Sequence, residues 1–159
     1  GSWLGGCLFW GWLRSHPALH LPVEAVALPL ACVGLDTKWR LGSGFYLSCL
    51  LGTAFTDLMM MFTGVMKAWP EVVEAPINKA PELLNSTAKE LLKPNLLFLL
   101  IAAGVLIFIL AKLMQERGCI QTANGKTWLV ASAALITTLW VDGLFLLTTF
   151  VQPQLSGLI

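Results

Sequence analysis

The sequence predicts an all-α, polytopic transmembrane protein with about four to five membrane segments, at about 20 residues a crossing, and one short amphipathic surface helix. Its 159 residues are 57% apolar and only 12% charged, whereas soluble domains carry about 25% charged residues. The mean hydropathy is +0.75, and several apolar runs reach the length of a bilayer crossing. This composition excludes a water-soluble globule, and residues 1–159 are expected to form a single integral membrane domain.

Three runs are long enough to cross a bilayer. Residues 95–114 follow Pro94, which suits a first helical turn, and contain one charge, Lys112. Residues 127–151 are apolar apart from Asp142 and a few hydroxyl groups. Residues 41–66 are long enough to cross with a tilt. We expect each run to be a helix, because a helix satisfies its own backbone hydrogen bonds in hydrocarbon.

The N-terminal part is less regular. Residues 3–13 are apolar and rich in tryptophan, but too short to span a bilayer. Residues 19–35 are also apolar, yet they contain Glu24, Pro22 and Pro29. Proline inside a helix removes a hydrogen bond and kinks it. We therefore predict a kinked or broken helix over residues 19–35, with a shallow re-entrant element as the alternative.

The connection over residues 68–93 differs in kind, because it is rich in lysine and glutamate. Pro81 followed by Glu82 is a helix-start signal. Apolar residues then recur on one helical face, at Leu83, Leu84, Ala88, Leu91 and Leu92. The pattern predicts a short amphipathic helix that lies on the membrane surface, contacts a partner, or packs beneath a loop.

Alternating spans would place residues 36–40 and 112–126 on one side of the membrane, called face A. These two loops are basic, and the positive-inside bias assigns face A to the cytoplasm or a plastid stroma. The opposite side, face B, receives Arg14 and the amphipathic connection.

Three acidic residues fall inside predicted spans, and they share one half of the bilayer. Asp57 and Asp142 each lie nine residues from the face-B end of their run, about 14 Å deep at 1.5 Å per residue. Glu24 lies a turn or two inside the same face. Such groups must be neutral, paired or directed at protein. The expected buried polar helix contacts are Arg14, Glu24, Asp57 and Asp142; a proton or ion relay and ligation of a pigment or lipid are the alternatives.

His16 and His20 have the i,i+4 spacing of residues that share a helix face, although Pro17 lies between them. With Glu24 they could bind a metal, but no further ligands have suitable spacing, so we expect no metal site. A chlorophyll magnesium needs only one axial ligand at the membrane edge. The candidates for that role are His20, His16, Asn95 and Glu24, and the alternative is a histidine satisfied by backbone or lipid headgroups.

Several function classes have no support. Ten Lys and Arg residues against nine Asp and Glu leave a net charge of +1, which offers no basic surface for nucleic acid. Motifs of nucleophilic, phosphate-binding, zinc-protease and dinucleotide sites are missing, so we expect no enzyme. The four cysteines show no metal-binding spacing, and most lie in apolar runs, where a thiol behaves as a small apolar group.

Several strings occur in the order of a known pattern: Trp10-Gly-Trp-Leu-Arg14, His20-Leu-Pro-Val-Glu-Ala25, Leu28-Pro29, Phe45-Tyr-Leu47, Leu51-Gly-Thr-Ala-Phe-Thr-Asp-Leu58 and Val141-Asp-Gly-Leu-Phe145. In these strings the chain resembles a cyanobacterial and plastid family of multi-pass membrane proteins of unknown function. The likeness departs over residues 71–116, and relatives begin with more apolar sequence, so we expect the first span to be incomplete here. The resemblance implies a thylakoid membrane and no particular activity.

We therefore expect a small accessory subunit of a photosynthetic complex, photosystem I with its antenna before photosystem II. It would stabilise assembly, contact the bilayer and the other subunits, and hold chlorophyll, carotenoid or lipid. The sixteen aromatic residues suit such ring systems, although they suit lipid equally well. A small secondary transporter or ion-conducting protein is the main alternative, because the proline-broken segment carries an acid. A transient photosystem assembly factor is the other.

Overall fold

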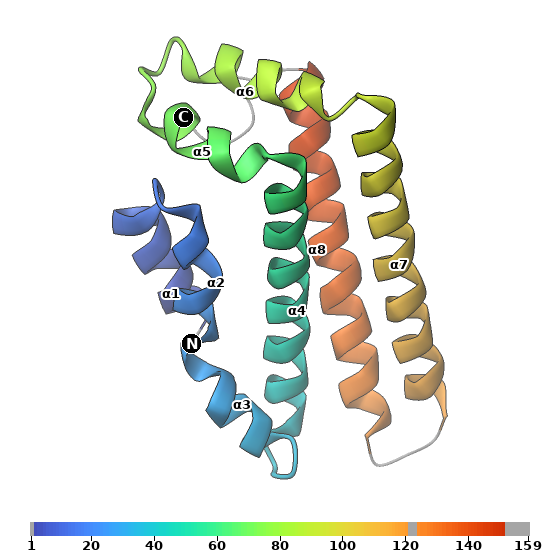
Figure 1. Cartoon of the computed structure of the whole chain (residues 1–159). Coiled ribbons are helices and arrows are strands. Elements are labelled where there is room, and N and C mark those ends of the chain that lie inside the picture. Colours follow the sequence, from blue (N-terminus) through green and yellow to red (C-terminus); the bar gives the residue numbers. More distant parts are fainter. Residues whose placement is uncertain (1, 121–123, 152–159) are drawn as a thin grey trace.

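The computed structural model describes residues 2–120 and 124–151, and every element within them is helical. Three long helices run side by side: α4 (Arg40–Thr63), α7 (Pro94–Cys119) and α8 (Gly125–Val151). Short N-terminal helices flank α4, and two further helices lie across one end of the bundle (Figure 1). The predicted all-α architecture is confirmed.

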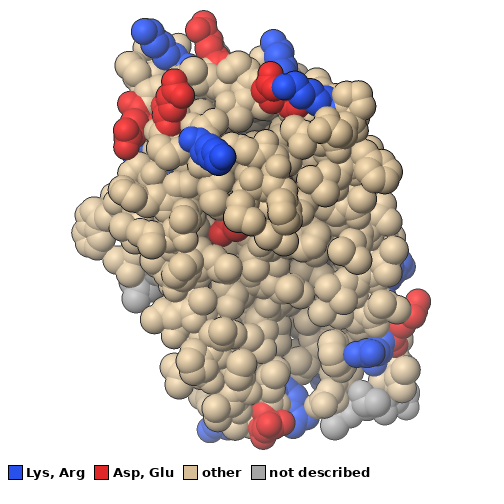
Figure 2. All heavy atoms as spheres, in the orientation of Figure 1, with Lys and Arg blue, Asp and Glu red and all other residues tan. Residues whose placement is uncertain are grey.

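Among the described residues, four helical segments are long and apolar enough to cross a membrane: α4, α7, α8 and the broken segment Pro17–Gly34. They match the predicted runs 41–66, 95–114, 127–151 and 19–35. Figure 2 shows charged side chains gathered at the two ends of the molecule, with an almost uncharged band between them in which some acidic atoms are visible. A multi-pass membrane protein has this distribution.

The N-terminal part folds back along itself. Helix α1 (Ser2–Leu8) continues as a π-helical turn over Phe9–Leu13. After a 3-10 turn at Pro17–Leu19, the chain reverses direction into α2 (His20–Glu24), a second 3-10 turn at Ala25–Ala27, and α3 (Leu28–Gly34).

The predicted break in this segment is confirmed. It falls just before Pro29, which occupies the first turn of α3 and has no N–H to donate back. The segment then continues to the turn before α4, at the far end of the bundle (Figure 1), so the re-entrant alternative is wrong.

The connection over residues 68–93 contains two helices, and the expectation of a single one is wrong. Gly64, with a φ of 81°, ends α4 three residues before the predicted limit. Helix α5 (Val65–Glu74) follows and ends where Ala75 becomes extended before Pro76. Helix α6 (Ala80–Glu90) is the predicted amphipathic helix.

Both helices pack inward on the bundle. Trp69 and Val72 of α5 and Leu84 and Ala88 of α6 are buried, and α6 packs against α8.

Helix α8 is the centre of the bundle, because α4 and α7 both pack along it and touch each other little. Its contact with α7 holds the small apolar core of Ile107, Ala111 and Leu135. Its contact with α4 is close, because residues without bulky side chains recur every four positions on α4, at Gly44, Ser48 and Gly52, and all three are buried. The bundle thereby holds the middle of α4, with its acidic residue Asp57, between α8 and the N-terminal helices.

Candidate functional site

A histidine bridges two carboxylates between α2 and α4. The Nδ1 atom of His20 lies 3.2 Å from Asp57 Oδ1, and its Nε2 atom lies 3.4 Å from Glu24 Oε1. The side chains of His20, Glu24 and Asp57 are 26%, 17% and 13% exposed. Only doubly protonated imidazole has a donor at both ring nitrogens, so the geometry suits a cation between two anions. We call these three residues the His20 cluster.

Two further side chains hold Glu24 in this position. The Thr53 hydroxyl donates a hydrogen bond to Glu24 Oε2 over 3.1 Å. The Tyr46 hydroxyl donates to the main-chain oxygen of Glu24 over 2.5 Å. Both carboxylate oxygens and the backbone carbonyl of Glu24 thus have partners: Oε1 contacts His20 within α2, and the other two oxygens join the end of α2 to α4.

Helical spacing explains why these groups converge. His20 and Glu24 are four residues apart on α2, and Thr53 and Asp57 are four apart on α4, so each pair shares a helix face. Phe9, which is 3% exposed, covers the His20 ring at a centroid distance of 4.4 Å. Helix α1 can approach because Gly5 has no side chain: a Cβ atom there would lie 3.0 Å from the carbonyl oxygen of Val23.

Asp142 meets α4 from another side. The Thr56 hydroxyl donates to Asp142 Oδ2 over 2.5 Å and also lies 3.2 Å from the main-chain oxygen of Gly52. Because Thr56 and Asp57 are neighbours, α4 connects Asp142 on α8 to the His20 cluster on α2. All three acids that the sequence places inside spans therefore contact protein groups.

Arg14 departs from the prediction. Its side chain is exposed at the turn after Leu13, where a long cationic chain reaches water, so the expectation of a buried contact is wrong. Its main-chain oxygen is used instead, accepting a 3.0 Å hydrogen bond from Trp69 Nε1 on α5. Trp10 packs edge-on against the same indole, at 6.3 Å between ring centroids. These contacts join the N-terminal turn to α5.

The remaining predicted ligands lie apart from the His20 cluster. His16 is exposed and its Nδ1 atom contacts only the neighbouring Ser15 hydroxyl, at 3.1 Å. Asn95 is exposed in the first turn of α7. Ligation of a pigment by His20 would require one of its two carboxylate contacts to open. In the described part of the chain, no group of three His, Cys, Asp or Glu side chains is arranged to hold a metal ion.

Sequence reasoning missed Tyr46, Thr53 and Trp69 as members of these networks. The i,i+4 spacing of Thr53 and Asp57 was an available signal for one of them. Tyr46 and Trp69 had none, because each bonds to a main-chain oxygen whose position depends on the tertiary fold.

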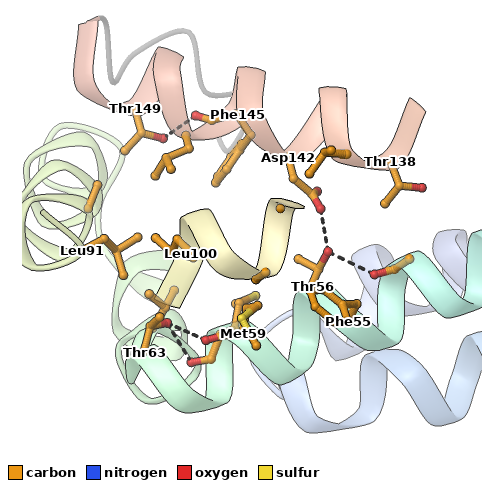
Figure 3. A pocket seen from close by; sticks show the side chains of 18 of the residues that line it. Phe55, Thr56, Met59, Thr63, Leu91, Leu100, Thr138, Asp142, Phe145 and Thr149 are labelled. Carbon is orange, nitrogen blue, oxygen red and sulfur yellow. Dashed lines mark hydrogen bonds between the residues drawn. The ribbon is translucent and has the colours of Figure 1, made fainter. Parts of the chain in front are cut away.

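A cavity of about 230 Å³ adjoins Asp142 on the side of α4 and α8 that faces α7. Figure 3 shows Thr56 and Asp142 bonded to each other at its edge, among Phe55, Met59 and Phe145. Leu91, which follows the last residue of α6, and Leu100 of α7 line it from other sides. The cavity and the His20 cluster thus lie against different parts of the same α4 segment.

The four long apolar segments and the polar groups gathered between them define a multi-pass helical membrane protein. The chain matches the family described as "Protein of unknown function (DUF3120)" over residues 1–150, and it belongs to that family. Neither a curated protein nor a solved structure matches it significantly.

Proposed function

We propose that the chain is a small, non-enzymatic accessory subunit of a photosynthetic membrane complex, photosystem I with its antenna before photosystem II. It would stabilise the assembly and contact pigments or lipids. The observation that carries the proposal is that the polar groups of the His20 cluster bind one another. Its histidine and glutamate use their polar side-chain atoms on one another and on α4, which is the behaviour of groups that join helices.

The outer surface supports a role in packing. Helix α7 packs mainly on α8, and it leaves large apolar side chains exposed along its length, among them Phe98, Ile101, Val105, Phe108 and Leu113. Such a surface suits lipid tails, flat pigments or the helices of other subunits. The photosynthetic location itself rests on the resemblance of the chain to cyanobacterial and plastid membrane proteins.

For chlorophyll, the geometry favours ligands outside the His20 cluster. His16 keeps its Nε2 atom without a partner among the described residues, and Asn95 is exposed near the start of a span. Either could reach a magnesium ion at the membrane edge without breaking the cluster. Carotenoid or lipid contact needs only the apolar helix faces.

Purification from the native membrane in mild detergent tests the proposal. We expect the tagged chain in green fractions of high mass, at a constant ratio to the core subunits. Recovery only with immature complexes would indicate a transient assembly factor instead. A colourless small oligomer would contradict the photosynthetic role.

A proton- or ion-conducting protein is the second candidate, favoured by the continuity of the ionisable groups. His20 contacts both Glu24 and Asp57. Thr56, the residue before Asp57 on α4, donates a hydrogen bond to Asp142 on α8. Protonatable groups in this arrangement are typical of relays through membranes.

Replacement of Asp57 or Asp142 by Asn separates the two roles. Asn keeps a hydrogen-bonding oxygen but carries no titratable proton. In a relay, proton flux measured with a pH dye in liposomes should fall at least tenfold in Asp57→Asn and Asp142→Asn, while both variants still fold. If the acids only join helices, assembly should persist and the wild-type chain should carry no flux.

A further inference from the structure

We infer that the cavity between α4, α7 and α8 binds the chain of a membrane lipid whose hydroxyl group hydrogen-bonds to Asp142. The inference deepens the lipid contact of the proposed function and rests on that part alone. It does not depend on pigments or on membership of a photosynthetic complex.

The position of the cavity determines where a ligand enters. Helices α4 and α7 each pack along α8 but have little contact with each other, and the partly open cavity occupies the space between them. Helices α5 and α6 contribute Trp69 and Leu84 at its face-B end. All three long helices cross the membrane band, so the molecules that reach an opening between them are lipids.

The shape favours a chain over a broad ring. The lining on α4 extends from Gly52 to Thr63, a distance of about 16 Å along the helix at 1.5 Å per residue. A volume of about 230 Å³ distributed over that length is narrow. It nevertheless exceeds the roughly 150 Å³ of an apolar cavity that takes up benzene.

The lining specifies an apolar body. Most of the wall is aliphatic, aromatic or thioether, with Phe55, Met59, Ile107, Leu139 and Phe145 from three helices. The hydroxyls of Thr63 and Thr149 bond to carbonyls of their own helices, so they present methyl groups more than polar ones. Methionine adapts its shape to irregular apolar ligands.

Asp142 provides one polar contact. Thr56 uses its Oδ2 atom, whereas Oδ1 has no hydrogen bond within the described residues. No fully buried side-chain oxygen in that part of the chain lacks a partner, so Oδ1 must be accessible, and Asp142 lines the cavity. A polar atom without a hydrogen-bond partner is unfavourable in hydrocarbon. A ligand hydroxyl is the matching group, because it both donates and accepts.

Photolabelling of the isolated full chain in phosphatidylcholine nanodiscs tests this site. The probe is a dodecanol with a diazirine in mid-chain, and labelled peptides are mapped by mass spectrometry. We expect labels on cavity residues of α4, α7 and α8, such as Met59, Leu100 and Leu139. Unlabelled 1-dodecanol should compete at a concentration about tenfold lower than dodecane.

Two glycine variants provide a matched pair. Gly104 lines the cavity, and a Cβ atom there would meet only Leu139, at 3.8 Å. Gly143 is exposed on α8, with nothing within 4 Å of its Cβ position. Gly104→Leu should fill the cavity and lower its labelling about tenfold, whereas Gly143→Leu should leave it unchanged.

The polar contact is tested separately at Asp142. Asp142→Asn keeps an acceptor and should retain the preference for dodecanol over dodecane, whereas Asp142→Leu should abolish it. Labelling that falls equally on the outer α7 residues Phe98 and Ile101, and that is unaffected by Gly104→Leu, would overturn the inference. The labelling experiment uses the isolated chain, so its failure would overturn only the lipid site. The proposed function fails by a different result, namely absence of the chain from green complexes.

Discussion

His20 is held by contacts on both edges of its ring and by Phe9 against its face. His20→Leu would leave Glu24 and Asp57 close together with no donor between them. We expect the free energy of unfolding to fall by about 1–3 kcal/mol, the usual cost of a buried polar group that loses its partner. Denaturant titration of the purified protein in mixed micelles measures the change.

His16 is the matched control for this substitution. It is exposed and contacts only its neighbour Ser15. His16→Leu should therefore change stability by less than about 0.5 kcal/mol. Equal effects of the two substitutions would mean that the bridging histidine contributes nothing to folding.

Trp69 makes a single hydrogen bond whose value can be measured. Its indole N–H donates to the main-chain oxygen of Arg14, and Trp69→Phe would remove the donor while keeping an aromatic ring. We expect a loss of about 1 kcal/mol in the same unfolding titration. Trp12→Phe, at a position that is 79% exposed, is the control and should be neutral.

At the scale of elements, the contact between α4 and α8 depends on missing side chains. A Cβ atom at Gly52 would lie 2.8 Å from Thr138 Cγ2, so Gly52→Ala must push the two helices apart. Overpacking of this kind costs about 1–3 kcal/mol. We expect a lower thermal midpoint, measured by circular dichroism in detergent.

Gly42 lies on the same helix with nothing within 4 Å of its Cβ position. Gly42→Ala should be neutral or stabilising, because alanine is the better helix former by up to about 1 kcal/mol. If the Gly52→Ala and Gly42→Ala proteins were equally stable, the close approach of α4 and α8 would contribute nothing to stability.

The end of α4 is a feature that the apolar run in the sequence does not predict. The predicted span continued to residue 66, since Val65 and Met66 are as apolar as the residues before them. Gly64 instead takes a left-handed conformation, and the following residues begin α5. Hydropathy has no term for that turn, which is stabilised by the burial of Trp69 and Val72 at the end of the bundle.

At the scale of the whole molecule, the bundle has two polar ends. The direction of each described helix determines which end its two termini reach. The turn at residues 36–39, the end of α7 and the start of α8 lie at one end, and α5 and α6 lie at the other (Figure 1). Single cysteines at Lys38 and Lys126, in a background without Cys7, Cys32, Cys49 and Cys119, should react with an impermeant maleimide from the same side of sealed vesicles. A cysteine at Asn78 should react from the opposite side.

Labelling before and after permeabilisation provides the control, because each position must react once both sides are open. The positive-inside bias further predicts that Lys38 and Lys126 face the cytoplasm or stroma. Reaction of these two positions from opposite sides would contradict the bundle topology.

The membrane-spanning runs could be read from the sequence because hydrocarbon imposes a local rule. Each run must be long and apolar enough to cross and must satisfy its own backbone, so 95–114 and 127–151 are predictable without knowing their neighbours. The shared depth of Asp57 and Asp142 follows from the same counting along helices. Pro29 likewise predicts a break wherever its segment packs.

Which side chains meet was decided by the tertiary structure alone. His20 and Asp57 are 37 positions apart, and Thr56 and Asp142 are 86 apart. Their contacts require α2 and α8 to lie against different sides of α4, an arrangement that depends on the fit of Gly52 to Thr138 and on the hydrogen bonds from Tyr46 and Thr53 to Glu24. Helix packing depends on how the shapes of many side chains fit together, and a short stretch of sequence does not specify that fit.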